Sequence, residues 1–141
     1  MKITHHKHVS IDDARMHYAN LLDEKVDELR DSYYAKGFWI VEEYRLAVEE
    51  ALDFKKRNYT GTAPPTVASY AQASSVSVQI ATDNILTTKE ATDRMLIYTR
   101  HIRLTGKSII SNAASVAQIR AAYQAAVEAL SNLVLPVPTP L

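Results

Sequence analysis

The sequence predicts an all-α protein, and three observations point to this class. Only three glycines occur in 141 residues, so few tight turns interrupt the chain. Apolar residues recur at steps of three and four along most of its length, which is the spacing of one helix face. Serines and threonines precede several of these stretches, where their hydroxyls can cap helix N-termini. We therefore expect a long N-terminal helical hairpin or kinked rod, then a small multi-helix bundle, with an extended proline-containing C-terminal arm.

The first predicted helix covers residues 11–36. Ser10 and Asp13 form a capping-box-like start. After these residues, apolar side chains recur along one face of the predicted helix, and acidic side chains lie on the opposite face. Gly37 either ends this helix or kinks one longer rod. The stripe consists of Ile11, Ala14, Tyr18, Leu22, Val26, Leu29 and Tyr33, and the acidic face of Asp23, Glu24, Asp27, Glu28 and Asp31.

The next helix is predicted over residues 38–54 and is followed by a linker. It begins with four apolar residues, and its glutamates at 42, 43, 49 and 50 are expected on the solvent side. Residues 59–66 read Tyr-Thr-Gly-Thr-Ala-Pro-Pro-Thr, which breaks the helical pattern. This is the natural boundary between two halves of the chain.

Short helices are predicted directly after the linker. Thr66 is placed to cap a helix over residues 67–73, and Ser74 or Ser75 to cap the next one, which runs to Leu86. Residues 76–79 alternate apolar and polar, so a short strand competes with the helix there.

Two longer helices and an arm complete the prediction. Thr87 with Glu90 resembles a capping box that opens a helix to about Leu104, which Gly106 ends or bends. Ser115 with Gln118 opens the last helix in the same way. Residues 135–141, Leu-Pro-Val-Pro-Thr-Pro-Leu, favour an extended, polyproline-like arm.

Charged residues are unevenly distributed along the chain. Residues 1–57 hold 22 of the 32 charged side chains, whereas residues 58–141 hold 10. Because interface cores are depleted in charge, the second part suggests an assembly subunit. We divide the chain into an acidic amphipathic helical region (1–57), a Gly/Pro linker (58–66), a charge-poor helical region (67–134) and the C-terminal arm (135–141).

Composition excludes several functional classes. The net charge is zero and no cluster of Lys and Arg is large enough for a phosphate-binding surface, so we expect no nucleic-acid partner. No apolar run approaches the roughly 18 residues of a membrane-spanning helix, so we expect no membrane partner. No cysteine occurs, and no serine stands in a nucleophile motif. We therefore expect no enzymatic activity and no cofactor.

Three groups of residues are candidate sites. His5, His6 and His8 carry metal-ligand chemistry, although a solvated or partner-docked arm explains them more simply. A basic group is suited either to binding anions or to pairing with the acidic first helix of its own or a neighbouring chain; it comprises Arg94, Arg100, Arg103, Lys107 and Arg120. The third group is aromatic and suited to an interface, with burial in the subunit core as the alternative; it comprises Tyr33, Tyr34, Phe38, Trp39, Tyr70, Tyr98 and Tyr123.

Residues 44–130 resemble a helical segment of small tail and tail-fibre-associated proteins of tailed bacteriophages. The resemblance covers about 87 residues and leaves out the acidic first helix and the proline arm. Its motifs are Tyr44-Arg45-x-Ala47, Phe54, Tyr59-Thr60-Gly61-x-x-Pro64-Pro65-x-Val67-x-x-Tyr70-Ala71, Ala81-x-Asp83-x-Ile85-Leu86, Ile102-Arg103 and Val116-Ala117-x-Ile119-x-x-Ala122.

The resemblance implies a virion or tail-assembly protein without enzymatic activity. Such a protein is made in the host cytoplasm, remains in the virion tail, and binds other tail proteins or copies of itself. Two alternatives stay open. The first is an assembly chaperone that binds a tail-fibre protein transiently. The second is a phage-encoded, host-directed inhibitor or small-ligand-binding protein.

Overall fold

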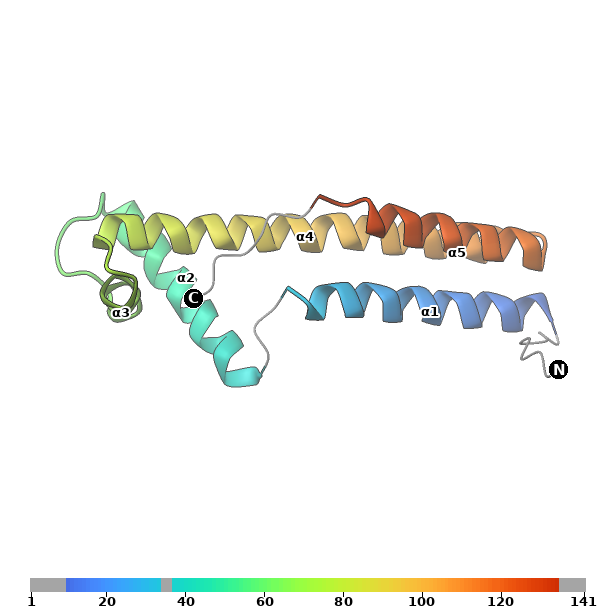
Figure 1. Ribbon diagram of the computed structural model, residues 1–141, viewed down its shortest axis with the longest axis horizontal. Coiled ribbons are helices and arrows are strands. Elements are labelled where there is room, and N and C mark those ends of the chain that lie inside the picture. The colour runs from blue at the N-terminus through green and yellow to red at the C-terminus, as the bar shows by residue number, and fades with distance from the viewer. Residues whose placement is uncertain (1–9, 34–36, 135–141) are drawn as a thin grey trace. The chain divides into compact units, whose positions relative to one another are not determined.

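The computed structural model describes residues 10–33 and 37–134, and in these ranges it contains five α-helices and no strand (Figure 1). The predicted all-α class is confirmed. The strand considered for residues 76–79 does not form. The helices are α1 (Ile11–Asp31), α2 (Phe38–Lys56), α3 (Pro65–Ser74), α4 (Val78–Asn112) and α5 (Val116–Ser131).

The described residues form two compact units, each with its own core. The α1/α5 unit contains α1, the part of α4 from Leu96 onward, and α5; the α2/α3 unit contains α2, α3 and the part of α4 up to Met95. In Figure 1, α1 (blue) and α5 (orange to red) lie along the later part of α4. The largest fully buried side chains are Leu22, Val26, Ile110 and Ile119 in the α1/α5 unit, and Phe54, Val67, Ile85 and Met95 in the α2/α3 unit.

Both capping pairs predicted from serine are present. The Ser10 hydroxyl accepts a hydrogen bond from the Asp13 amide at 3.1 Å, and α1 begins at the next residue. The Ser115 hydroxyl accepts from the Gln118 amide at 3.2 Å. These bonds satisfy amide groups that have no partner within the helix itself.

Helix α1 is shorter than predicted, because it ends at Asp31 and not at residue 36. The Ser32 hydroxyl donates to the carbonyl of Leu29 at 2.6 Å, and its amide donates to the carbonyl of Glu28 at 3.3 Å. These bonds occupy carbonyl groups that the end of a helix leaves without partners. Residues 34–36 lie outside the described ranges.

The predicted cap of α3 is wrong. The helix begins with Pro65 at its first position, where a missing amide proton costs nothing, and Pro64 occupies the position expected for Thr66. Thr66 lies inside the helix, and its amide and hydroxyl both donate to Oε1 of Glu50, at 3.0 and 2.8 Å. A carboxylate from α2 therefore accepts at the start of α3 in place of a local side chain.

Helix α4 was predicted as separate pieces, with a new start at Thr87 and an end or bend at Gly106. The structure corrects this, because α4 is one helix of 35 residues. Its first turn is held by the Ser77 hydroxyl, which accepts from the Ile80 amide at 3.1 Å. Gly106 is buried in the helix, where an added Cβ would lie 2.7 Å from Leu22 Cδ2 and 3.1 Å from Ala126 Cβ. The glycine therefore allows three helices to approach closely; it does not end one.

Candidate functional site

The first turn of α2 exposes four large apolar side chains in succession. Phe38, Trp39, Ile40 and Val41 are 66%, 76%, 51% and 45% exposed. The rings of Phe38 and Trp39 meet edge to face, with centroids 4.9 Å apart. Because successive helix residues point in different directions, this apolar surface surrounds the helix. We call residues 38–41 the apolar α2 turn.

The apolar α2 turn extends the helix face that packs the core of the α2/α3 unit. Ile40 precedes Tyr44 by four residues and Ala47 by seven, so all three share one side of the helix. Tyr44 and Ala47 pack against the core, and burial raises the pKa of the Tyr44 hydroxyl. Ile40 remains half exposed. The core of the α2/α3 unit therefore covers this side of α2 from Tyr44 onward and leaves Ile40 half exposed.

A shallow groove lies between the end of α4 and the first half of α5. Its volume is about 630 Å³, and it is broadly open to solvent. Ile109 contributes a side chain that is 54% exposed. We call this the α4/α5 groove, and its lining is mainly small and uncharged: Ser108, Ile109, Asn112, Ala113, Gln118, Ala121, Ala122 and Ala125.

No residue that lines the α4/α5 groove is charged, but the segment that contains these residues is basic. From Leu96 to Val127 the sequence has four cations, Arg100, Arg103, Lys107 and Arg120, and no acidic residue. Arg120 Nε donates to the Tyr18 hydroxyl of α1 at 3.2 Å.

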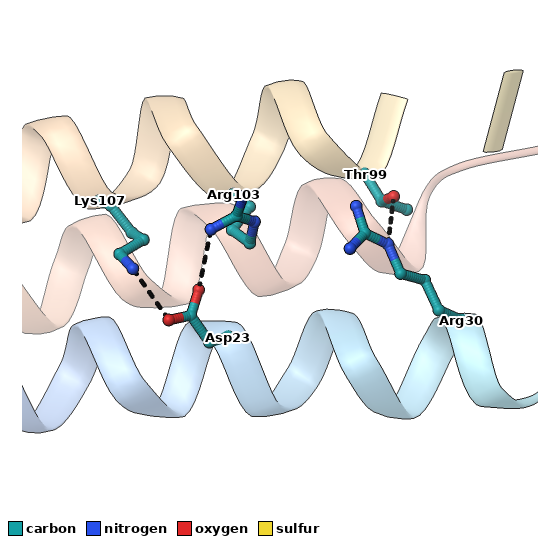
Figure 2. Close-up of polar contacts among 5 residues, drawn as sticks. All are labelled: Asp23, Arg30, Thr99, Arg103 and Lys107. Atoms are coloured by element: carbon teal, nitrogen blue, oxygen red, sulfur yellow. Dashed lines mark hydrogen bonds and ion pairs between the residues drawn. The ribbon is translucent and has the colours of Figure 1, made fainter. Parts of the chain in front are cut away.

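Asp23 of α1 binds two of these cations (Figure 2). Its carboxylate lies 2.8 Å from Lys107 Nζ and 3.3 Å from an Arg103 guanidinium nitrogen. Partial burial raises the pKa of Asp23, but the hydrogen bonds and charges of Lys107 and Arg103 outweigh burial and hold it below its ordinary value. The predicted pairing of the basic group with the acidic first helix is thus confirmed for these two residues within one chain.

The same close-up shows a second polar link between α1 and α4. Arg30 Nε donates to the Thr99 hydroxyl at 3.1 Å (Figure 2). Arg30 is in the last turn of α1, where a cation is also favoured by the helix dipole. Nearer the other end of α1, an Arg15 guanidinium nitrogen donates to the carbonyl of Ala113 at 2.7 Å.

The early part of α2 carries the opposite charge. Residues 38–50 include four glutamates and one arginine. Arg45 pairs with Glu42 at 2.9 Å and also with Glu49, while Glu50 accepts from Thr66. Glu43, two residues after the apolar α2 turn, is exposed. The early part of α2 is therefore acidic, and three of its four glutamates have partners within the α2/α3 unit.

The predicted interface aromatics are placed in both units. Phe38 and Trp39 are exposed, as is Tyr98 at 47%. Tyr70 and Tyr123 are partly buried against the cores of the α2/α3 and α1/α5 units, respectively. Tyr33 is half-buried, and Tyr34 lies outside the described residues. Among the predicted interface aromatics that the structure describes, only Phe38 and Trp39 therefore form a contiguous exposed surface.

The metal candidates His5, His6 and His8 also lie outside the described residues. Across residues 10–33 and 37–134, no group of three or more His, Asp or Glu side chains is arranged to hold a metal ion. Within the same ranges no helix is both long and apolar enough to cross a membrane.

Sequence reasoning missed the α4/α5 groove, because the groove exists only where two helices pack side by side. Its small, uncharged lining residues form no pattern in the sequence that marks a groove. Comparison of the chain with protein-family models, curated proteins and solved structures gives no significant match.

Proposed function

We propose that this protein is a non-enzymatic structural subunit of a tailed-bacteriophage virion, associated with the tail, baseplate or tail fibre and acting by protein–protein docking. The observation that supports docking best is the apolar α2 turn, where Phe38 and Trp39 stand side by side in solvent. Aromatic side chains of this kind dominate the binding energy of protein interfaces. The assignment to a phage tail rests on the sequence resemblance over residues 44–130.

The finer arrangement forms part of this proposal. The chain up to residue 57 acts as a hairpin or kinked rod, the charge-poor helical region as a bundle, and the proline arm at 135–141 as a tether to neighbouring subunits. The partners are other tail proteins or further copies of the chain. The protein is made in the host cytoplasm and retained in the virion.

Mass spectrometry of purified particles tests the proposal. We expect peptides of this protein in a fixed ratio to the major tail proteins. Their absence from particles, with the protein present in infected-cell extracts, would overturn the structural role and favour the assembly chaperone. Particles of normal morphology and infectivity after deletion of the gene would instead favour the host-directed alternative.

A pair of substitutions connects the result to the α2 surface. Trp39→Ala removes most of the exposed aromatic area and should reduce incorporation into particles. Leu52→Ala is the matched control, because Leu52 is on the same helix and 55% exposed but lies outside the apolar α2 turn. Equal incorporation of the two variants would contradict docking through this turn.

A further inference from the structure

The loop between α2 and α3, residues 57–64, divides both hydrophobic cores in the same way. In the α1/α5 unit, Leu22 lies before the loop in the sequence and belongs to one core with Ile119, which lies after it. In the α2/α3 unit, Phe54 lies before the loop and shares a core with Ile85 after it. Neither core is therefore complete on one side of the loop.

Polar contacts join the same two parts of the chain. Asp23 of α1 pairs with Lys107 of α4 at 2.8 Å, and Glu50 of α2 accepts from the Thr66 amide of α3 at 3.0 Å. Each contact connects a residue before the loop to a residue after it. The contacts would be the same if the second residue belonged to another copy of the chain.

The loop begins with a strained backbone conformation. Helix α2 ends in a Schellman motif, in which the amides of Asn58 and Tyr59 donate to the carbonyls of Lys55 and Phe54, each at 2.9 Å. The motif requires a left-handed residue at Asn58, which has a φ of 54°, and asparagine tolerates this conformation. Tyr59 follows with a φ of 57°, which is rare for a bulky side chain. Straightening of the loop would release the strain at Tyr59.

We propose that two copies of this chain exchange the segment up to residue 57, so that α1 and α2 of each copy pack on α3, α4 and α5 of the other. Residues 58–63 act as the hinge. The exchange preserves the contacts within both units and releases the strain at Tyr59, and a short, strained hinge favours this kind of exchange. The inference deepens the proposed assembly role and rests on it, because it identifies a second copy as one partner.

The length of the hinge tests the proposal. Deletion of Gly61 and Thr62 makes it harder for the chain to reverse between α2 and α3, so this variant should dimerise at least about tenfold more tightly than the wild type. Insertion of a flexible Gly/Ser segment after Gly61 should weaken dimerisation at least about tenfold, because a longer loop closes without strain. Sedimentation velocity over a range of concentrations measures both. Equal dissociation constants for the two variants, or no dimer of the shortened chain, would overturn the proposal.

Cross-linking identifies which chains share a unit. The chain has no cysteine, so the variant Asp23→Cys/Lys107→Cys contains only two thiols, at positions whose native side chains are in contact. A short bismaleimide should join these thiols within one chain in the monomer fraction from size exclusion, and between two chains in the dimer fraction. Denaturing electrophoresis distinguishes the products. A dimer fraction that is linked only within single chains would contradict the exchange.

A second pair of thiols reports on the other unit. In Glu50→Cys/Thr66→Cys the thiols lie on α2 and α3, and the dimer fraction should again be linked between two chains. If only the first pair links two chains, α1 alone is exchanged and the hinge at residues 58–63 is wrong. Lys25→Cys/Glu28→Cys is the matched control, because both positions are on α1 and their native side chains are in contact. Its link should stay within one chain in every fraction.

Circular dichroism distinguishes exchange from misfolding. The monomer and dimer fractions should have the same helix content, because the exchange retains every helix; a dimer with reduced helix content would overturn the proposal. If the chain is found in virions but its dimer fraction is linked only within single chains, the exchange is wrong and the proposed function stands. If the dimer is linked between chains and the protein is absent from virions, the reverse holds.

Discussion

The two units differ in how polar groups link their helices. In the α1/α5 unit, Asp23 pairs with Arg103 and Lys107, which joins α1 to a helix far along the chain. In the α2/α3 unit, the ion pairs seen among the described residues connect side chains three or four positions apart on one helix: Arg45 with Glu42 and Glu49, Arg57 with Asp53, and Lys89 with Asp93.

The segments of the α2/α3 unit are linked instead by carboxylates that accept hydrogen bonds from neutral donors. Glu50 accepts from the amide and hydroxyl of Thr66. Asp83 accepts from the Tyr59 hydroxyl, and this bond, with burial and the carboxylate charge, raises the pKa of Tyr59. The α1/α5 unit should therefore respond more strongly to salt and pH, and the α2/α3 unit to loss of its aromatic core.

The largest expected effect comes from Phe54→Ala. Phe54 is fully buried, its ring meets Tyr59 edge to face at 5.9 Å, and the Arg57 guanidinium lies 5.3 Å from its centroid. Replacing it with Ala should cost about 3–5 kcal/mol in the free energy of unfolding. Hydrogen exchange should show lost protection in α2 and α3 but not in α1 and α5. Equal losses in all four would mean that the two units unfold as one.

Gly106→Val should have the next largest effect, in the other unit. A Cβ at this position already falls 2.7 Å from Leu22 Cδ2, and Leu22 is fully buried, so it has little freedom to move away. Overpacking of this kind costs about 2 kcal/mol. Urea denaturation measures the loss. Thr105→Val, at an exposed neighbouring position, should change stability by less than about 0.5 kcal/mol, and similar losses in both variants would contradict the packing role.

Glu50→Ala tests the carboxylate at the start of α3. Removing it leaves the Thr66 amide without its acceptor, at a cost of about 1 kcal/mol, as for the loss of a helix cap. Hydrogen exchange should accelerate in residues 65–74. Glu43→Ala is the control, because Glu43 is exposed on the same helix. If hydrogen exchange in α3 is unchanged in Glu50→Ala, the hydrogen bond from the Thr66 amide to Glu50 does not stabilise the start of this helix.

These residues also show how far the sequence can predict the structure. The all-α class and the caps at Ser10 and Ser115 were predictable, because each depends on neighbours within four positions. The role of Gly106 was not, since it is set by Leu22 and Ala126 on other helices. Thr87 looked like a helix start because local rules cannot tell a cap from a residue inside a longer helix. Exposure of Phe38 and Trp39 likewise depends on where the core ends, which no local pattern records.

Among the main predictions, Asp23→Asn should change the free energy of unfolding least. This substitution tests the ion pairs that join α1 to α4. The Asp23 side chain is 37% exposed, so solvent screening limits the contribution to roughly 0.5–1 kcal/mol at neutral pH. Because the folded-state pKa lies below the ordinary value of 3.8, this stability is present above that value and is lost as the pH falls through the lower folded-state pKa. Thermal unfolding of the wild type and the variant should therefore differ at pH 7 and converge below about pH 4.

The dependence of stability on salt concentration distinguishes the two units in the same experiment. Screening over about 10 Å at 0.1 M salt should reduce the difference between the wild type and Asp23→Asn as ionic strength rises. Asp53→Asn is the matched control, because Asp53 pairs with Arg57, the residue that caps the C-terminus of α2, and such local pairs contribute only about 0.3–0.5 kcal/mol. A larger effect for Asp53→Asn than for Asp23→Asn would reverse the comparison. It would mean that pairing along one helix stabilises this protein more than pairing between helices.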